Sequence, residues 1–332
     1  MQSQELIWGG TIVRRITAVL TFLGIVILAA NLMFAQGPPA GQGAAPGGGG
    51  AGRGGGQGRG GGAAGGAPAI KPVPNKPWLY MVTGLGGNTT VRVTSDGLVV
   101  VDTKNLGEAN YNQLMDQIKT VSQAPVKYAV VTHVHQDHAG NTDSFIKAGA
   151  KVVAHENLKK NLETYTSAQG KPGTPNELYA KDYAIKLGGV EVQVHHYAAG
   201  HTSGDSIVYF PDLKVVAMGD EFASNGGNCD YAQGGSILEW AKSIGEVLKL
   251  DIDTVIPGHG NDPMTKADLQ AFKARLDSIS KNAIDLVKKG TPKDQLIAAI
   301  GAADATANVG GLLMNNQARI DAFYDEVVKA AK

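Results

Sequence analysis

The chain has 332 residues, 43% of them hydrophobic, and its 30 lysines and arginines balance 30 aspartates and glutamates. That length allows about two domains. The single cysteine excludes a disulfide framework and cysteine-rich zinc modules, and the zero formal charge argues against a dedicated binder of nucleic acid or anionic membranes. The 45 glycines are about twice the average usage, so their distribution is the first clue to how the chain is organised.

Residues 1–36 contain a long apolar segment. Arg14 and Arg15 precede residues 16–35, which carry no charge and are long enough to cross a bilayer as a helix. A cleaved signal peptide and an uncleaved N-terminal membrane anchor both fit this pattern, and the arginine pair predicts that the rest of the chain is exported. We therefore expect a periplasmic or secreted protein, held at the inner membrane if the segment stays uncleaved.

Residues 37–70 are predicted to be a disordered glycine-rich linker. Of the 45 glycines, 17 lie between Gly37 and Gly66, where no large apolar side chain offsets the entropy of ordering the chain. Four arginines against one glutamate give residues 1–70 a net charge of +3, which leaves 26 basic and 29 acidic residues, or −3, for the remainder. This mildly acidic remainder argues further against a polyanionic partner such as nucleic acid.

The sequence after residue 70 has the pattern of a folded domain, expected at residues 71–265, with a helical extension, residues 266–332, packed on it. Apolar periodicity predicts strands at 91–93, 98–102, 126–132, 151–154, 190–195, 206–209, 214–218 and 254–256, and helices at 109–121, 139–148 and 237–248. Thr265 and Asp268 have the spacing of a helix capping box, and Gly290 is placed to end that helix. Mixed strands and helices predict two internal sheets with helices outside.

Four side chains that commonly bind metals stand within six residues after the strand expected at 126–132. Residues two apart point the same way in an extended segment, so His133 and His135 are placed to face one metal ion. Asp137 and His138 follow where the chain turns into a helix and are placed to face a second ion. A hydrophobic core would not tolerate this cluster and a solvated loop has no need of it, so we interpret it as a metal site.

Three further candidate ligands each follow a β-like run, and each has glycines nearby that permit tight turns: His201, Asp220 and His259. One histidine after a strand is more often structural. Together with the cluster, however, these residues make a set of five histidines and two aspartates, which suits a dinuclear site of borderline-soft metals. We therefore predict two Zn²⁺ ions per chain.

With these motifs in this order, the sequence resembles the metallo-β-lactamase superfamily from about Tyr80 to Thr265, including the strand at 98–102 before the histidine cluster. The resemblance implies an α/β fold of four layers, the αββα sandwich, here with added C-terminal helices. The implied ligands of one zinc are His133, His135 and His201, those of the other are Asp137, His138 and His259, and Asp220 bridges the two ions.

The functional hypothesis is a zinc-dependent hydrolase that attacks an ester, thioester, lactone or amide bond of a small molecule with a hydroxide bridging the metals, oriented by Asp137. One alternative is a true β-lactamase acting on antibiotics. The zinc β-lactamases with the most similar motifs have cysteine where this chain has Asp220, and lysine where it has Ala223. Another alternative is a tethered zinc-binding protein without catalysis. Membrane contact is expected only through residues 16–35, and the oligomeric state stays open.

Several residues around the motifs have weaker signals. Asp102 is a candidate carboxylate for orienting a ligand histidine, His155 reads as structural, and His195 or His196 is a candidate to orient a ligand. Together with Trp78 and Tyr80, residues 84–88 fit either a flap over the site or an ordinary hairpin turn, and residues 225–228 are expected near the substrate.

Overall fold

The computed structural model describes residues 66–332. The expected export segment and almost the whole glycine-rich linker lie outside these residues. Within the described part of the chain, none of the helices has the length and apolar character needed to span a membrane.

The first sheet has seven strands arranged in chain order. Strands β1 to β4 run antiparallel, whereas β4 to β7 run parallel with helices in their crossovers. The strands are β1 (Ala69–Pro72), β2 (Leu79–Thr83), β3 (Thr89–Thr94), β4 (Gly97–Val101), β5 (Val126–Val130), β6 (Lys151–His155) and β7 (Glu177–Tyr179). The crossover helices are α1 (Glu108–Lys119), α2 (Gln136–Ala139), α3 (Thr142–Lys147) and α4 (Glu156–Thr164).

The second sheet has six strands in the order β13-β12-β11-β10-β9-β8. They are β8 (Asp182–Leu187), β9 (Val190–His195), β10 (Ile207–Phe210), β11 (Val215–Ala217), β12 (Thr254–Ile256) and β13 (Met264–Thr265). Only β11 and β12 pair in parallel, and α5 (Ile237–Val247) lies in the connection between them. Short 3-10 turns follow β10 at Pro211–Leu213 and β11 at Gly219–Glu221, and another precedes α5 at Tyr231–Gln233.

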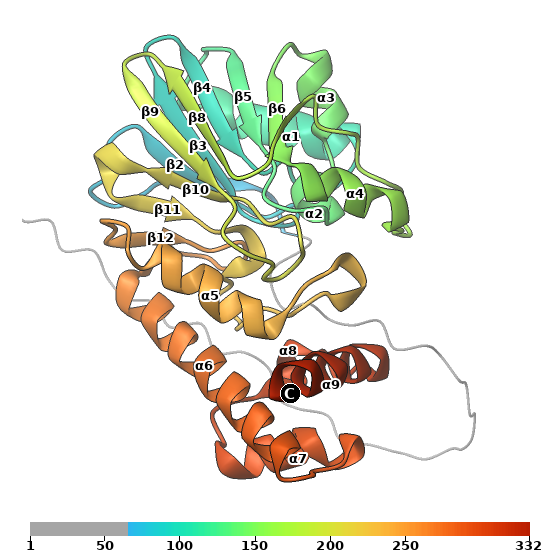
Figure 1. Cartoon of the computed structure of the whole chain (residues 1–332). Coiled ribbons are helices and arrows are strands. Elements are labelled where there is room, and N and C mark those ends of the chain that lie inside the picture. The colour runs from blue at the N-terminus through green and yellow to red at the C-terminus, as the bar shows by residue number, and fades with distance from the viewer. Residues whose placement is uncertain (1–65) are drawn as a thin grey trace, which may run out of the picture. The chain divides into compact units, whose positions relative to one another are not determined.

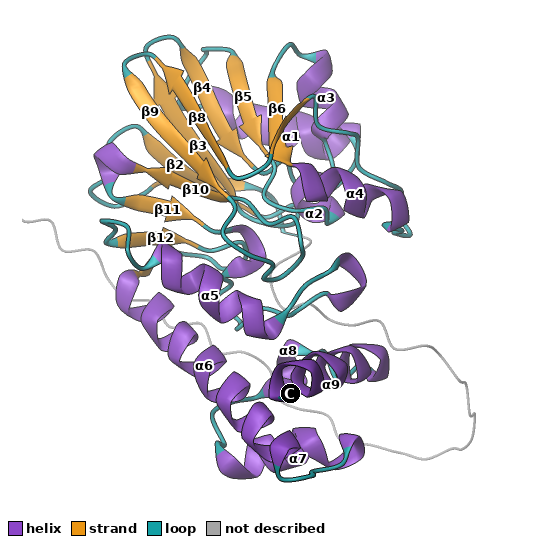
Figure 2. Cartoon of the chain, in the orientation of Figure 1, coloured by secondary structure: helices purple, strands orange, loops and turns teal. Residues whose placement is uncertain are grey.

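The layers follow from which faces of the strands are apolar. In β4, Val99 and Val101 pack between the two sheets, while Leu98 and Val100 pack against α1, α3 and α4. A strand covered on both faces reads as a continuous apolar run, as this one does. On the other side, Trp240 of α5 belongs to the core over the second sheet. The predicted four-layer αββα sandwich is therefore confirmed (Figure 1 and Figure 2).

Residues 266–332 form the helices α6 (Lys266–Lys288), α7 (Lys293–Ala303), α8 (Val309–Leu312) and α9 (Gln317–Ala331). The predicted capping box is confirmed, since the Thr265 hydroxyl accepts from the Asp268 amide and the Asp268 carboxylate accepts from the Thr265 amide. Gly290 follows the helix with φ of +84°, a conformation that favours glycine. Phe323 of α9 joins the same apolar core as α5 and α6, so the extension packs on the sandwich.

The helix predicted at 139–148 is shorter in the structure, because α2 ends at Ala139 and α3 begins only at Thr142 and ends at Lys147. Gly140 lies at the break, where a Cβ would come 2.2 Å from the Leu106 amide nitrogen. Next to it, the Asn141 side chain donates to the carbonyls of Thr103 and Asn105. This close packing against the loop after β4 interrupts the helix, and apolar periodicity does not register such contacts.

Candidate metal centre

The seven predicted ligands lie together at one edge of the sandwich, although they come from four separate segments. His133 and His135 follow β5, whereas Asp137 and His138 lie in α2. The other three occupy loops or turns after β9, β11 and β12: His201, Asp220 and His259. Their donor atoms form two groups, in each of which all atoms lie within 4.8 Å of one another. The groups are His133, His135, His201 and Asp220, and Asp137, His138 and His259.

In the first group, three imidazole rings present ring nitrogens toward one another. Nδ1 of His135 lies 2.9 Å from Nε2 of His201. Nε2 of His133 is buried and has no hydrogen-bond partner within the described structure. A buried nitrogen without a partner is costly in an ordinary core, but it is what a metal ligand requires, so these residues fit a bound cation.

In the second group, a carboxylate joins two histidines. Oδ2 of Asp137 lies 3.3 Å from Nε2 of His259, and the Nε2 atoms of His138 and His259 are 3.2 Å apart. Asp220 lies between the two groups: Oδ1 is 3.2 Å from His138 Nε2, and Oδ2 is 3.9 Å from His201 Nε2. Its two oxygens therefore face different groups, the arrangement a bridging carboxylate needs.

A network around Asp102 orients two of the histidines. The Asp102 carboxylate accepts from the Thr132 amide at 2.8 Å, from the Thr132 hydroxyl at 2.9 Å and from His138 Nδ1 at 2.7 Å. Since the Thr132 hydroxyl donates to Asp102, His133 Nδ1, 3.0 Å away, donates to that hydroxyl. Both rings thus carry their proton on Nδ1 and present Nε2 to the site, as the outer partners of metal-binding histidines usually ensure.

The other two histidines of the first group are oriented by the loop before α5. His201 Nδ1 donates to the Asn228 carbonyl at 2.6 Å, and His135 Nε2 donates to Asp230 Oδ2 at 2.9 Å. Within residues 225–228, which stay a prediction for substrate contact, the Asn228 carbonyl holds His201. Asp230 was not predicted, because no motif surrounds it.

Residues 82–259 match a family model described as the metallo-beta-lactamase superfamily. The chain belongs to this superfamily. The resemblance drawn from the motifs is confirmed, and the match ends before α6, so it does not include the C-terminal helices.

Individual relatives agree with this membership. The chain is 30% identical over 201 residues to metallo-beta-lactamase IND-1 of Chryseobacterium indologenes, covering 57% of this chain and 80% of that protein. It is 28% identical over 183 residues to a type 2 metallo-beta-lactamase of Bacillus cereus, covering 52% and 66% respectively.

Solved structures share the fold at low identity. A metallo-beta-lactamase from Pontibacter korlensis aligns with a TM-score of 0.56 at 23% identity, over 63% of this chain and 99% of that one. The sec-alkylsulfatase Pisa1 from Pseudomonas sp. aligns with a TM-score of 0.58 at 22% identity, over 70% of this chain and 45% of that one. These two likenesses show the fold.

The two groups of this superfamily member differ in their electrostatics. Burial lowers the pKa of His133 well below its ordinary value and that of His201 to about 4, so both imidazoles are neutral, the form that binds metal. Asp220 raises the pKa of His259 to about 9. Burial would raise the pKa of Asp137, but His138 and His259 outweigh it and hold that pKa at about 2. The imidazoles of the second group therefore lie in the negative field of Asp137 and Asp220, which favours a bound cation at this position, a proton or a metal ion.

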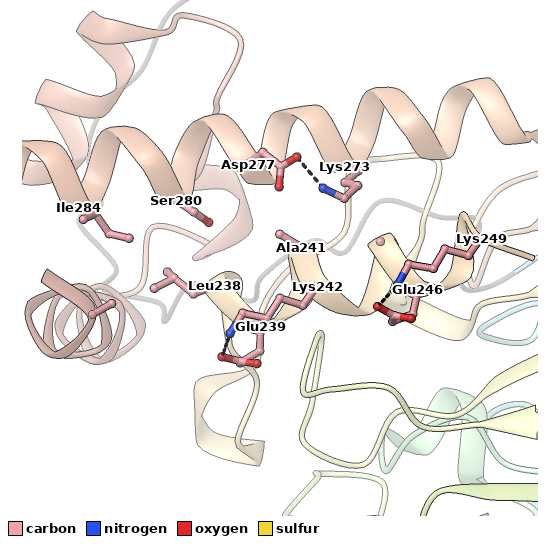
Figure 3. A pocket seen from close by; sticks show the side chains of 12 residues that line it. Leu238, Glu239, Ala241, Lys242, Glu246, Lys249, Lys273, Asp277, Ser280 and Ile284 are labelled. Carbon is pink, nitrogen blue, oxygen red and sulfur yellow. Dashed lines mark hydrogen bonds and ion pairs between the residues drawn. The ribbon is translucent and has the colours of Figure 1, made fainter.

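A cavity of about 670 Å³ lies beside the first group. Asp230, the partner of His135, lines it together with Tyr165, whose ring centroid is 5.7 Å from that of His135. The other lining residues are Thr164, Thr166, Tyr231, Ala232, Gln233, Asn316, Ala318, Arg319 and Ala322. A second hollow, of about 780 Å³, is lined mainly by α5 and α6 (Figure 3), and none of the seven ligand candidates lines either cavity. Ion pairs such as Lys273–Asp277 border it, as expected of a solvated helical surface.

Residues 84–88 form the turn between the paired strands β2 and β3, so the hairpin interpretation is confirmed. The same turn also packs against the site, since a Cβ on Gly87 would lie 2.2 Å from Cε1 of His138, and its role as a flap stays a prediction. Of the other histidines, His155 bonds the Ala180 carbonyl and stacks on His196, in agreement with a structural role. His196 bonds the Asp205 carbonyl and His195 bonds Asp182, so these bonds do not orient the ligand candidates.

Proposed function

We propose that this superfamily member is a dinuclear zinc hydrolase that cleaves an ester, thioester, lactone or amide bond in a small molecule. The observation that carries the proposal is the position of Asp220, whose two carboxylate oxygens face two separate groups of donors. Five imidazoles and two carboxylates suit zinc better than hard cations, which prefer oxygen ligands alone. When bound, a pair of zinc ions supplies Lewis acidity and an acidified water molecule.

The chain's own residues would divide the remaining tasks. Asp137 stays ionised because its pKa is about 2. Its carboxylate is therefore available to bind metal and to accept a hydrogen bond that orients the attacking water. The cavity beside Tyr165 and Asp230 would hold the substrate next to the first group. This cavity is bordered by α9, so the C-terminal extension would limit which substrates enter.

β-Lactamase activity is the second candidate function, favoured by the metallo-beta-lactamases among the relatives. Against it stands Ala223, which is buried and occupies the position of the lysine that would pair with an antibiotic carboxylate. Asp220 in place of cysteine also separates this chain from the β-lactamases with the most similar motifs. We therefore rank a broader hydrolase above an antibiotic-degrading enzyme.

Metal analysis combined with a hydrolysis screen tests these alternatives. The purified chain should contain two zinc ions and turn over one class among thioester, lactone, ester and amide substrates. Rapid hydrolysis of a chromogenic cephalosporin would establish the β-lactamase alternative. Bound zinc without turnover of any substrate in the screen would instead identify a tethered zinc-binding protein.

We also propose that the enzyme works after export, on the basis of the arginine pair before the charge-free residues 16–35. Its partner would be a small-molecule substrate rather than a nucleic acid, given the net charge of −3 after residue 70. Immunoblots of cytoplasmic, periplasmic, membrane and secreted fractions test this location, and the mass of the isolated chain shows whether the segment is cleaved. Recovery solely from the cytoplasm would overturn the export proposal.

A further inference from the structure

A single arginine on the C-terminal helix α9 holds the loop that orients two of the proposed ligands. Nη1 of Arg319 donates to Oδ1 of Asn228 at 2.8 Å and to the carbonyl of Cys229 at 2.9 Å. Its Nη2 lies 3.3 Å from Oδ1 of Asp230. Both members of the ion pair are largely buried, with side-chain exposures of 18% for Arg319 and 12% for Asp230.

The loop residues that Arg319 touches are those that contact the histidines. The Asn228 carbonyl accepts from His201, and Oδ2 of Asp230 accepts from His135, while Oδ1 of Asp230 faces Arg319. The Asp230 carboxylate is therefore held between a ligand histidine and the guanidinium. A planar guanidinium fixes several acceptors at once, which a lysine ammonium does not do with the same geometry.

The same loop has other anchors on the extension. The amide of Cys229 donates to the Leu312 carbonyl of α8 at 2.8 Å. Glu326 of α9 accepts hydrogen bonds from the hydroxyls of Tyr231 and Ser236. These contacts fix the path of the loop. Of the groups named here on α8 and α9, only Arg319 contacts both Asn228 and Asp230, the residues that orient the two histidines.

We propose that Arg319 is a positioning residue for the first group, which contains His133, His135 and His201. Through this residue, α9 is part of the metal centre. The inference rests on the proposed function, because it presumes that the two groups bind zinc. Loss of the guanidinium leaves Oδ1 of Asp230 held only by the Ala232 amide at 3.2 Å, which weakens the hold on the carboxylate beside His135, and leaves the Asn228 side chain without its donor. Loss of an outer partner of this kind usually weakens metal binding about 10–100-fold.

The effect should be confined to one of the two groups. His138 is oriented by Asp102 and is packed against Gly87, neither of which Arg319 contacts in the bonds described. Selective weakening separates a positioning role from general destabilisation of the extension, which would affect both zinc ions and the melting temperature together.

The experiment compares the full chain with its Arg319→Ala and Arg319→Lys variants, using stepwise zinc titration against a chromophoric chelator. Lys293→Ala is the matched control, since it removes a cation that pairs with Asp321 of α9 at 3.2 Å on the exposed side. Arg319→Ala should weaken one zinc-binding step about 10–100-fold and leave the other unchanged. Arg319→Lys should fall between it and the parent, and Lys293→Ala should match the parent.

A double-mutant cycle identifies the path of the effect. If Arg319 acts through Asp230, the double variant should resemble Asp230→Asn alone, so that the two substitutions are far from additive. The absorption spectrum of cobalt(II) bound to each variant reports on the first group and does not depend on turnover. Equal zinc affinities in Arg319→Ala and the parent, or equal weakening of both steps, would overturn the inference. A parent chain that binds fewer than two zinc ions would overturn the proposed function and, with it, this inference.

Discussion

The Asp102 carboxylate lies 2.7 Å from Nδ1 of His138, and both side chains are almost completely buried. Asp102 itself has φ of +65°, an uncommon conformation for a residue other than glycine. The backbone at this strand end thus adopts a costly conformation that turns the carboxylate toward His138 and Thr132. Such local strain is a frequent feature of functional sites.

Asp102→Asn should weaken zinc binding at the second group about 10–100-fold. The amide keeps the shape of the carboxylate, but its NH₂ cannot accept the hydrogen bonds that one carboxylate oxygen receives from His138 and the Thr132 hydroxyl. Zinc titration against a chelator measures the effect. Unchanged affinity in both steps would show that His138 keeps its orientation without Asp102.

Gly87→Ala should disturb the same histidine from the opposite side. Its Cβ would lie 2.2 Å from Cε1 of His138, so the ring or the β2–β3 turn must move, at a cost of about 1–3 kcal/mol in the free energy of unfolding. Urea denaturation and zinc stoichiometry measure the two consequences. The matched control is Gly301→Ala in α7, where a Cβ meets nothing within 4 Å and helix propensity predicts a gain of about 0.5–1 kcal/mol.

Much of the fold and the ligand set was predictable because both depend on patterns local to the sequence. Alternating and continuous apolar runs located most strands, and the motif from His133 to His138 placed four donor side chains within six residues. Asp102 was predictable as an orienting carboxylate because it closes a strand next to that motif, and the structure confirms it.

The missed features depend on contacts between distant segments. Asp230 lies 95 positions from His135, and Arg319 lies about as far again from Asp230, so no spacing rule connects the three. Strand β8 (Asp182–Leu187) was missed because only one of its six residues, Ile185, is buried, so its apolar pattern is weak. It is the edge strand of the second sheet and is fixed by pairing with β9, which a local pattern does not reveal.

Asp220→Ala should leave the chain with one tightly bound zinc ion instead of two. Without the bridging carboxylate, less negative charge between the groups offsets the repulsion of two divalent ions, and the second group keeps only Asp137 as an anionic ligand. Metal analysis after gel filtration measures the stoichiometry, and the hydrolysis screen measures turnover, which should fall with it. Two retained zinc ions with full turnover would contradict the bridging role of Asp220.

Asp205 should make the stability of the protein depend on pH. Burial raises its pKa from 3.8 to about 7, although Thr202 donates to it through both amide and hydroxyl. Because the folded state binds this proton more tightly than the unfolded state, the associated stability is complete below about pH 4 and is lost as the pH rises through about 7.

Asp205→Asn removes that ionisation and should therefore unfold with a flatter pH dependence than the parent. Urea denaturation of both proteins between pH 4.5 and 8, with a chelator present so that zinc does not add its own pH dependence, measures the difference. The pKa of the nearby Glu221 is raised by burial and by the charge of Asp205, so Asp205→Asn also brings the Glu221 pKa down, which flattens the pH dependence in the same direction. The stability of the variant relative to the parent should rise with pH up to about 7, and parallel curves would contradict a raised pKa of Asp205 in the folded state.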